Sequence, residues 1–309
     1  MSEKSVSKTM LIGASFLLLS ALLMSVSQVY YANQVQGVHP FLFTGISFFI
    51  TAVLFNMIAY RQRGTMTATA NTRSSMADVV KLNASSILAF MGFYYALKFI
   101  EPAIVSSLEM GVGPFFAIVV TAMVAKEKIR ATRAQWLITA GTFAASVLLM
   151  VTALAGLSGV QVTNTTDFVY GLVASVLCGL GAVLCTIYSK KLSVAGWTSS
   201  SILAHRFYGI IILSFLMTYK IFPTYLMANL DWILLITIFG VTIPMFLLQK
   251  GIQYCDPFVV MMSICFIPVF TFIFQLFDPR IAWSTPTLVG ILMLFIVGVA
   301  SLFTTNEAQ

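Results

Sequence analysis

The stretch YYALKFIEPAIVSSLEMGVGPFFAIVVTAMVAKEKIRATR, residues 94–133, decides the fold. It reads as the end of one apolar helix, a tight turn through Glu101 and Pro102, a second apolar helix and a short basic loop. Glu109 lies seven residues after Pro102, within the second helix. At a rise of about 1.5 Å per residue, its carboxyl group lies about 10 Å inside the apolar layer if the helix begins at Pro102. The stretch therefore predicts a membrane-spanning helix that carries a buried acid.

The composition indicates a protein that lies in a lipid bilayer. Hydrophobic residues make up 59% of the chain and charged residues 9%, and the mean hydropathy is +0.96. Soluble domains contain about 25% charged residues. Apolar runs of about 20 residues recur along the whole length with short polar or basic joints between them, which is the pattern of a multi-spanning helical membrane protein. The sequence predicts an all-α integral membrane fold.

Ten membrane-spanning helices are expected. They cover residues 9–30, 40–60, 79–99, 102–125, 134–154, 168–188, 199–218, 230–249, 258–276 and 285–303. If the N-terminus is cytoplasmic, the inside segments hold thirteen Lys and Arg residues and the outside segments three, with Arg206 left inside a span. This asymmetry follows the positive-inside rule and predicts two cytoplasmic termini. It also explains the net charge of +7 without a nucleic-acid partner.

A weak internal repeat divides the chain. Glu101-Pro102 in the first half corresponds to Asp256-Pro257 in the second, and each pair precedes an apolar helix with a proline inside it. We expect a first five-helix repeat over residues 1–154, an outside linker over 155–166 and a second repeat over 167–309. Five spans per repeat place the two copies in opposite orientations, and inverted repeats of this kind enclose a central cavity in transporters.

The motifs within these repeats resemble the EamA-type repeat of the drug/metabolite transporter superfamily. The first copy consists of Tyr95-Ala96-Leu97, Pro102-Ala103, Pro114, residues 126–129 and residues 135–137. The second consists of Gly251-Ile252, Asp256-Pro257, Pro268, residues 286–290 and Gly298, and it departs at 278–280, where the family has a Glu-containing loop. The resemblance implies a ten-helix inner-membrane carrier, often an exporter of amino acids, metabolites or drugs. It also implies a cavity lined by four helices of each half, and a homodimer contact through the fifth and tenth helices in some members.

Glu109 is the candidate for proton coupling. An acid in hydrocarbon is costly and normally faces a bundle interior or a watery cavity. Removal from water favours its neutral form, so the group can load and release a proton as access alternates. The alternative is a structural role, in which Glu109 is protonated or is bonded to a hydroxyl such as that of Ser106.

Arg206 is the arginine that lies well inside a span, about 10 Å from the cytoplasmic end of its helix. Its planar fork suits a substrate carboxylate, whereas a snorkelling side chain is the alternative. Glu109 enters its span from the opposite side, so a direct ion pair between the two is not expected. The neighbouring His205 is either a titrating group or a packing group with a hydrogen bond.

Further polar and aromatic residues are candidates for the cavity wall. Aromatic rings can stack on a substrate ring or face a cation, although they also form packing contacts and interfacial belts. Lysine can point into the cavity mouth or snorkel, and amides can line a cavity or join helices. These candidates are Tyr94, Tyr95, Tyr208, Lys250, Gln28, Asn83 and Gln275.

Glycine and proline near Glu109 predict a bend. Proline removes one hydrogen bond of the helix, and glycine lowers the local helix preference. The expected hinge residues are Gly111, Gly113, Pro114, Pro244 and Pro268. These helices are expected to move when the cavity changes sides.

The sequence favours a secondary transporter over other classes. It has two histidines, neither of the motifs HExxH and GxSxG, and no cysteine pair with the spacing of a metal site, so we expect no enzyme activity, metal or cofactor. A channel filter motif is not found. The expected function is alternating-access export of an amino acid or similar small polar metabolite, coupled to protons through Glu109. A facilitator, a substrate exchanger without proton coupling and a channel are the alternatives.

Overall fold

The computed structural model describes residues 3–62, 73–125, 131–160 and 164–304. Within these ranges every regular element is a helix. In chain order the elements are α1 (Glu3–Gln34), η1 (Val35–Gly37), α2 (Pro40–Arg61), α3 (Arg73–Ser86), η4 (Ile87–Met91), α4 (Gly92–Phe99), α5 (Pro102–Ala125), α6 (Arg133–Leu154), α7 (Thr165–Val194), α8 (Ser199–His205), α9 (Tyr208–Thr218), α10 (Phe222–Ile236), η5 (Thr237–Thr242), α11 (Ile243–Tyr254), α12 (Pro257–Ile264), α13 (Ile267–Gln275) and α14 (Thr285–Thr304).

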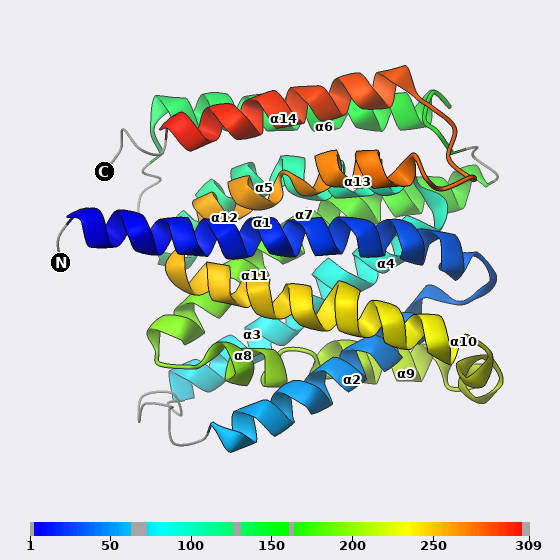
Figure 1. Ribbon diagram of the computed structural model, residues 1–309, viewed down its shortest axis with the longest axis horizontal. Coiled ribbons are helices and arrows are strands. Elements are labelled where there is room, and N and C mark those ends of the chain that lie inside the picture. Colours follow the sequence, from blue (N-terminus) through cyan, green and yellow to red (C-terminus); the bar gives the residue numbers. More distant parts are fainter. Residues whose placement is uncertain (1–2, 63–72, 126–130, 161–163, 305–309) are drawn as a thin grey trace.

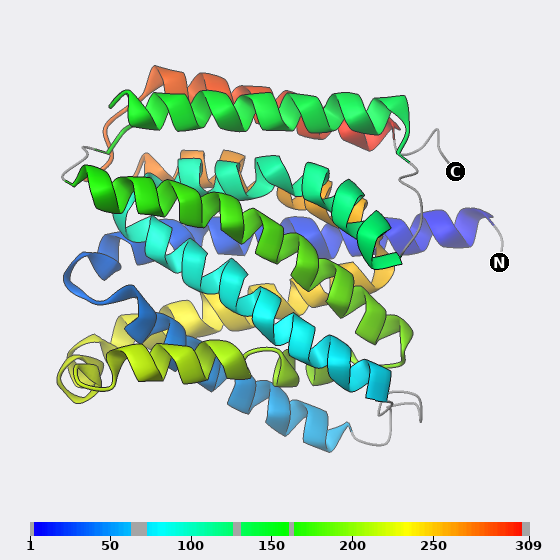
Figure 2. The ribbon, with the colours of Figure 1, turned by 180° about the vertical axis from the view of Figure 1, so that it is seen from behind.

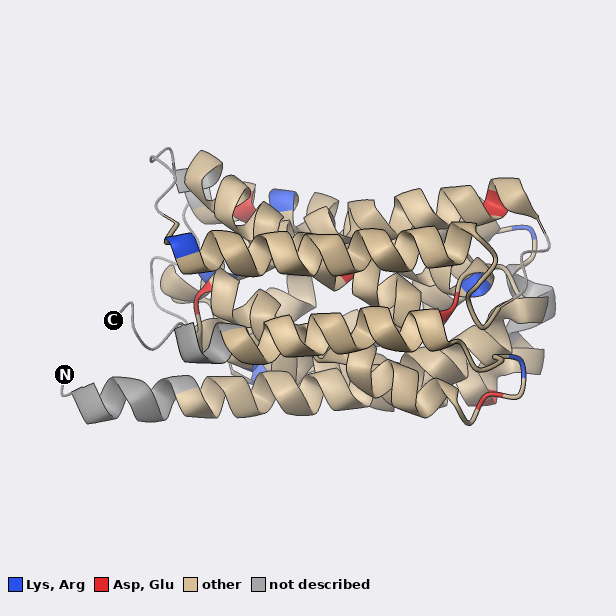
Figure 3. Cartoon of the chain, turned by 90° about the horizontal axis from the view of Figure 1, so that it is seen from above, with Lys and Arg blue, Asp and Glu red and all other residues tan. Residues whose placement is uncertain are grey.

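These helices form the expected membrane spans. Nine stretches of the described chain are long and apolar enough to cross a membrane, and Thr285–Ala300 in α14 is a shorter apolar stretch. Each of the ten expected spans overlaps one of them. Charged residues gather toward the two ends of the bundle, where a membrane-spanning protein meets water (Figure 3). The prediction of an all-α integral membrane fold is confirmed.

The two ends of the bundle carry different parts of the chain. The beginning of α1 and the end of α14 lie at the same end (Figure 1), which we call the terminal face and which also holds Asp256 and residues 195–198. The opposite end, the distal face, holds the joint between α4 and α5 with Glu101 and the joint between α13 and α14 with Asp278. The pair α6 and α14 lies side by side along one edge of the bundle in both views (Figures 1 and 2), and α2, α8 and α9 lie at the other edge.

Four of the spans are interrupted halfway across. η4 and η5 are π-helical segments, α8 and α9 are separated at Arg206 and Phe207, and α12 and α13 are separated at Cys265 and Phe266. Proline explains part of this, because Pro268 follows the last break and Pro244 follows η5, and neither can donate a backbone hydrogen bond. π-helical turns and broken helices occur where a membrane protein lines a cavity. The interruptions therefore point to the middle of the bundle as the place to look for a site.

Candidate functional site

Two adjoining compartments lie in the middle of the bundle. The distal compartment is lined by residues of α1, η4, α4, α5, α10, η5 and α13. The terminal compartment is lined by residues of α1, η4, α5, α7, α11, α12 and α13 together with Arg206. Their shared walls are formed by Met24, Phe90, Glu109, Met110 and Ile267. Each compartment measures about 50 Å³, which is room for a few water molecules. In this conformation the two compartments are therefore too small for more than a few water molecules each.

Glu109 lies where the two compartments meet. It is one of their shared lining residues, and its side chain is partly accessible from the cavity. The backbone of α5 approaches α7 closely here, because a Cβ atom on Gly179 would lie 2.5 Å from the carbonyl oxygen of Glu109. Cys178, the residue before Gly179, is buried on α7 beside Glu109. The close packing of α5 on α7 holds this acid at the centre of the molecule.

Arg206 occupies the break between α8 and α9. The break frees backbone groups, and two amides of neighbouring helices bond to them: Asn56 donates to the carbonyl of Ala204 at 3.0 Å, and Asn83 donates to that of His205 at 2.7 Å. Asn83 also accepts from the amide of Gly209 at 3.1 Å. Buried backbone groups need such partners in a membrane. These hydrogen bonds stabilise the break, which places Arg206 in the wall of the terminal compartment.

The guanidinium of Arg206 is buried with few partners. The side chain is 2% exposed, its Nε donates to Ser86 at 3.3 Å, and the rings of Phe90 and Phe207 lie 5.5 and 5.3 Å from it. The ion pairs within the described residues are Lys81 with Asp78 and Arg280 with Asp278, so Arg206 has no carboxylate partner there. A buried cation without an anion is unfavourable. The charge of Arg206 therefore favours a negative group in the terminal compartment.

Two other predicted wall residues reach the distal compartment. Tyr94 lines it and packs edge-on against the ring of Tyr31 at 4.8 Å. Gln28 lines it as well, with its amide donating to Thr271 and its oxygen accepting from Ser106 at 2.9 Å. These residues give the distal compartment an aromatic side and an amide side.

The remaining predicted wall residues lie away from both compartments. Tyr95 packs on Phe99, and Lys250 lies over the ring of Phe246. His205 bonds through Nδ1 to the carbonyl of Ser201 at 2.8 Å. The others found outside the compartment walls are Tyr208, packed on His205, Asn83 at the α8–α9 break, and Gln275 at the distal face.

The expected hinge residues have different surroundings. Pro114 lies inside the uninterrupted helix α5. A Cβ atom on Gly111 would lie 1.5 Å from the hydroxyl of Ser146, and one on Gly113 would lie 2.4 Å from Met261. These glycines therefore allow close packing between helices, whereas Pro244 and Pro268 lie beside the interruptions described above.

Several residues of the site carry little signal in the sequence. Ser86 and Phe90 lie beside Arg206, but a serine and a phenylalanine are ordinary in an apolar helix. Cys178 reads as a packing residue, and its contact with Glu109 appears only when α5 and α7 are placed together. The adjacent hydroxyls of Ser85 and Ser86 in mid-span are the one available hint.

An all-helical membrane bundle with broken helices around a central compartment, whose walls hold a buried acid and a buried arginine, is typical of a transporter. The model of the EamA-like transporter family matches residues 11–164, the first half of the chain. The chain belongs to this family and is a transporter of the drug/metabolite superfamily. No curated protein matches the sequence significantly. A solved structure entitled "Crystal structure of protein" superposes with a TM-score of 0.67 at 17% identity, over 96% of each chain; at this identity the likeness concerns the fold alone.

Proposed function

We propose that the chain is a secondary carrier that exports an amino acid, or a similar small polar metabolite, by alternating access. The observation that carries the proposal is the presence of Arg206 and Glu109 in the walls of one compartment. Within the described residues no ion pair joins them. A zwitterion supplies each with a partner, because its carboxylate fits the fork of Arg206 and its ammonium group pairs with Glu109.

The same pairing couples transport to protons. Glu109 can hold a proton or the ammonium group of the substrate, but not both. A substrate that enters from the cytoplasm displaces the proton to that side, and its release on the other side allows Glu109 to take up a proton there. One proton then moves inward for each substrate that moves outward. In this scheme Glu109 carries the proton, and Arg206, Tyr94 and Gln28 hold the substrate.

Export requires the walls to separate. Each compartment of about 50 Å³ holds only a few water molecules, so an amino acid needs a wider site. The interrupted helices beside Pro244 and Pro268 provide the bending points in this scheme, and the terminal face is the cytoplasmic one of an inner membrane. The outer pair α6 and α14 forms the contact of a homodimer.

A flux assay in proteoliposomes with an imposed pH gradient tests the coupling. Glu109→Gln is expected to retain exchange at saturating substrate and to lose gradient-driven accumulation. Asp231→Asn is the matched control, because Asp231 is an exposed acid outside the cavity, and it should behave like the unmodified protein. Arg206→Lys should weaken apparent substrate affinity about tenfold or more, since a bidentate contact is lost.

The other outcomes each identify a different function. An equal loss of exchange and accumulation in Glu109→Gln would leave this residue a structural role only. Flux in the unmodified protein that ignores the pH gradient would indicate a facilitator or a substrate exchanger. Flux that neither saturates nor shows acceleration by substrate on the other side would indicate a channel.

A further inference from the structure

Buried polar atoms without a partner are concentrated near the terminal face. In the described part of the chain, six such side-chain atoms occur, and five of them belong to Ser189, Trp197, Ser199 and Gln249. Gln249 contributes both its amide nitrogen and its oxygen. Ser189 and Gln249 each lie five residues before the end of their helix, and Ser199 begins α8, so all three are within about 8 Å of the helix ends. Since buried polar groups normally have partners, this concentration needs an explanation.

Two of these residues continue walls of the terminal compartment. On α7, Cys185 and Thr186 line the compartment, and Ser189 follows them at helical spacing on the same face. On α11, Met245, Leu248 and Ile252 line it, and Gln249 lies within the same stretch, four residues after Met245. Their polar groups therefore extend the compartment's wall toward the terminal face.

The third helix repeats the arrangement. Ser199 begins α8 and lies seven residues before Arg206, which directly follows this helix, so the two are about two turns apart on the same side. α8 packs against both α7 and α11. The faces of α7, α8 and α11 that carry Ser189, Ser199 and Gln249 thus all border the compartment that holds Arg206.

One hydrogen bond closes this group of helices at its outer end. The Nζ of Lys190 donates to the carbonyl of Gln253 at 2.7 Å and joins α7 to α11. Lys190 follows Ser189 directly, and Gln253 lies one turn beyond Gln249. The bond therefore lies between Ser189 and Gln249 on one side and the terminal face on the other.

We propose that Ser189, Ser199 and Gln249 line a passage through which water and the polar end of the substrate move between the Arg206 compartment and the terminal face, with the Lys190–Gln253 bond as its latch. The proposal rests on the carrier function proposed above. Hydroxyl and amide groups replace part of a solute's hydration shell without the strong attraction of a fixed charge. A zwitterion would pass such a wall without being trapped on it.

A hydrophobic replacement separates this role from a structural one. Gln249→Leu removes an amide that has no partner, so thermal stability should stay the same or rise, while transport should fall about tenfold because water and substrate lose a polar wall. A structural amide predicts the opposite, with lower stability. Unchanged transport in a well-folded Gln249→Leu variant would overturn the passage.

Thiol labelling tests the passage without any substrate. The four cysteines are replaced by serine or alanine, and Ser189→Cys, Ser199→Cys and Ser146→Cys are introduced singly. Ser146 is the matched control, since it is equally buried but bonds to the carbonyl of Ser107 at 3.0 Å. A membrane-impermeant thiol reagent is added to each side of membrane vesicles in turn.

Cysteines at 189 and 199 should react at least about tenfold faster than that at 146, because thiol reactivity requires access to water, and only from the side of the terminal face. Lys190→Met should speed their reaction further by opening the latch. Equal rates at all three positions, or no response to Lys190→Met, would overturn the passage even if transport assays support the carrier. Rapid labelling from one side, in a protein that shows no flux, would support the passage but contradict the proposed carrier function.

Discussion

The turns at Glu101-Pro102 and Asp256-Pro257 use the same local device on opposite faces of the molecule. Each places an acid before a proline that begins a helix, α5 in one case and α12 in the other. Asp256 is exposed and accepts hydrogen bonds from the amides of Phe258 and Val259 in its own helix. It is therefore a local N-cap, and its side-chain hydrogen bonds in the described chain stay within its own helix.

Glu101 has a different role, although its sequence context is similar. It is 1% exposed and accepts hydrogen bonds from the amide of Gly159 at 2.8 Å, from Gln275 and from Thr287 at 3.3 Å. These partners belong to the segment after α6, to α13 and to α14. Gln275 in turn accepts from the amide of Ala103 at 3.2 Å. The acid thus joins four parts of the chain at the distal face.

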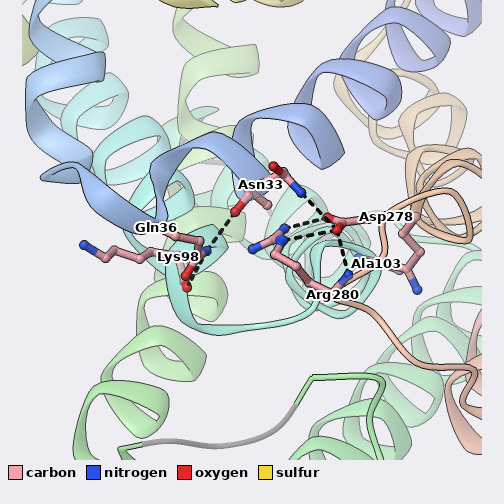
Figure 4. A network of polar contacts seen from close by, with 8 residues as sticks. Asn33, Gln36, Lys98, Ala103, Asp278 and Arg280 are labelled. Carbon is pink, nitrogen blue, oxygen red and sulfur yellow. Dashed lines mark hydrogen bonds and ion pairs between the residues drawn. The ribbon is translucent and has the colours of Figure 1, made fainter. Parts of the chain in front are cut away.

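A second set of contacts reinforces the distal face. Asp278 accepts from Asn33 at 3.1 Å and from the guanidinium of Arg280, and Gln36 donates to the carbonyl of Lys98 at 3.3 Å (Figure 4). Near the terminal face the Nζ of Lys190 donates to the carbonyl of Gln253 and joins α7 to α11, and Lys81 of α3 lies 5.6 Å from the centre of the Tyr188 ring of α7. The comparison teaches that buried acids join several helices at the distal face, and we expect the terminal face to open more easily.

The largest expected effect comes from removing the distal acid. Glu101→Ala should lower the free energy of unfolding by about 3 kcal/mol, because buried donors on Gly159 and Gln275 lose their acceptor. Denaturant unfolding in detergent measures it. A loss no greater than that of Asp256→Ala would abolish the distinction between the two turns.

The pH dependence of that loss sharpens the same comparison. Burial raises the pKa of Glu101, and the hydrogen bonds from Gly159, Gln275 and Thr287 offset this only in part. The folded state therefore binds this proton more tightly than the unfolded state. Its contribution to stability is full below the ordinary pKa of a glutamic acid and is lost as pH rises through the raised value. Glu101→Ala should cost most at acidic pH, and a cost that grows toward alkaline pH would contradict the burial argument.

Asp278 should show the opposite pH trend. Burial alone would raise its pKa, but the hydrogen bonds and charge of Arg280, with Asn33, lower it below its usual value. Its contribution is present above the ordinary pKa of an aspartic acid and is lost as pH falls through the lowered one. Asp278→Asn should cost about 1.5 kcal/mol at neutral pH, since the partly exposed Arg280 limits the gain. Unfolding at neutral and strongly acidic pH measures it, and an equal cost at both would refute the ion pair's role.

Local features of the sequence predict the spans and the isolated charges well. Apolar runs and the prolines at residues 40, 102 and 257 mark helices and their starts, because both signals act within a few residues. Glu109 and Arg206 can each be singled out, since a charge in an apolar run is costly. The presence of both residues in the wall of one compartment cannot be predicted from such local signals. It depends on the α8–α9 break and on the path of α5.

Long-range partners explain what sequence reasoning leaves out. Glu101 reads as a turn residue, yet its bond to Gln275 spans 174 positions. Asn83 reads as a wall residue, whereas in the structure it bonds to the backbone at the break beside Arg206. The π-helical segment at 87–91 contains neither glycine nor proline, so no local signal predicts it.

The smallest effect is expected at the terminal turn. Asp256→Ala should cost about 1 kcal/mol, the usual value of an N-cap, and Asp256→Asn almost nothing because asparagine caps equally well. Because the hydrogen bonds to Asp256 come from its own helix and Glu101 lies at the opposite face, the double variant with Glu101→Ala should show additive losses within about 0.5 kcal/mol. Denaturant unfolding of the four proteins in the cycle measures this. A larger coupling would mean that the two faces are energetically linked in this conformation. The contacts at the distal face and the opening of the terminal face would then depend on each other.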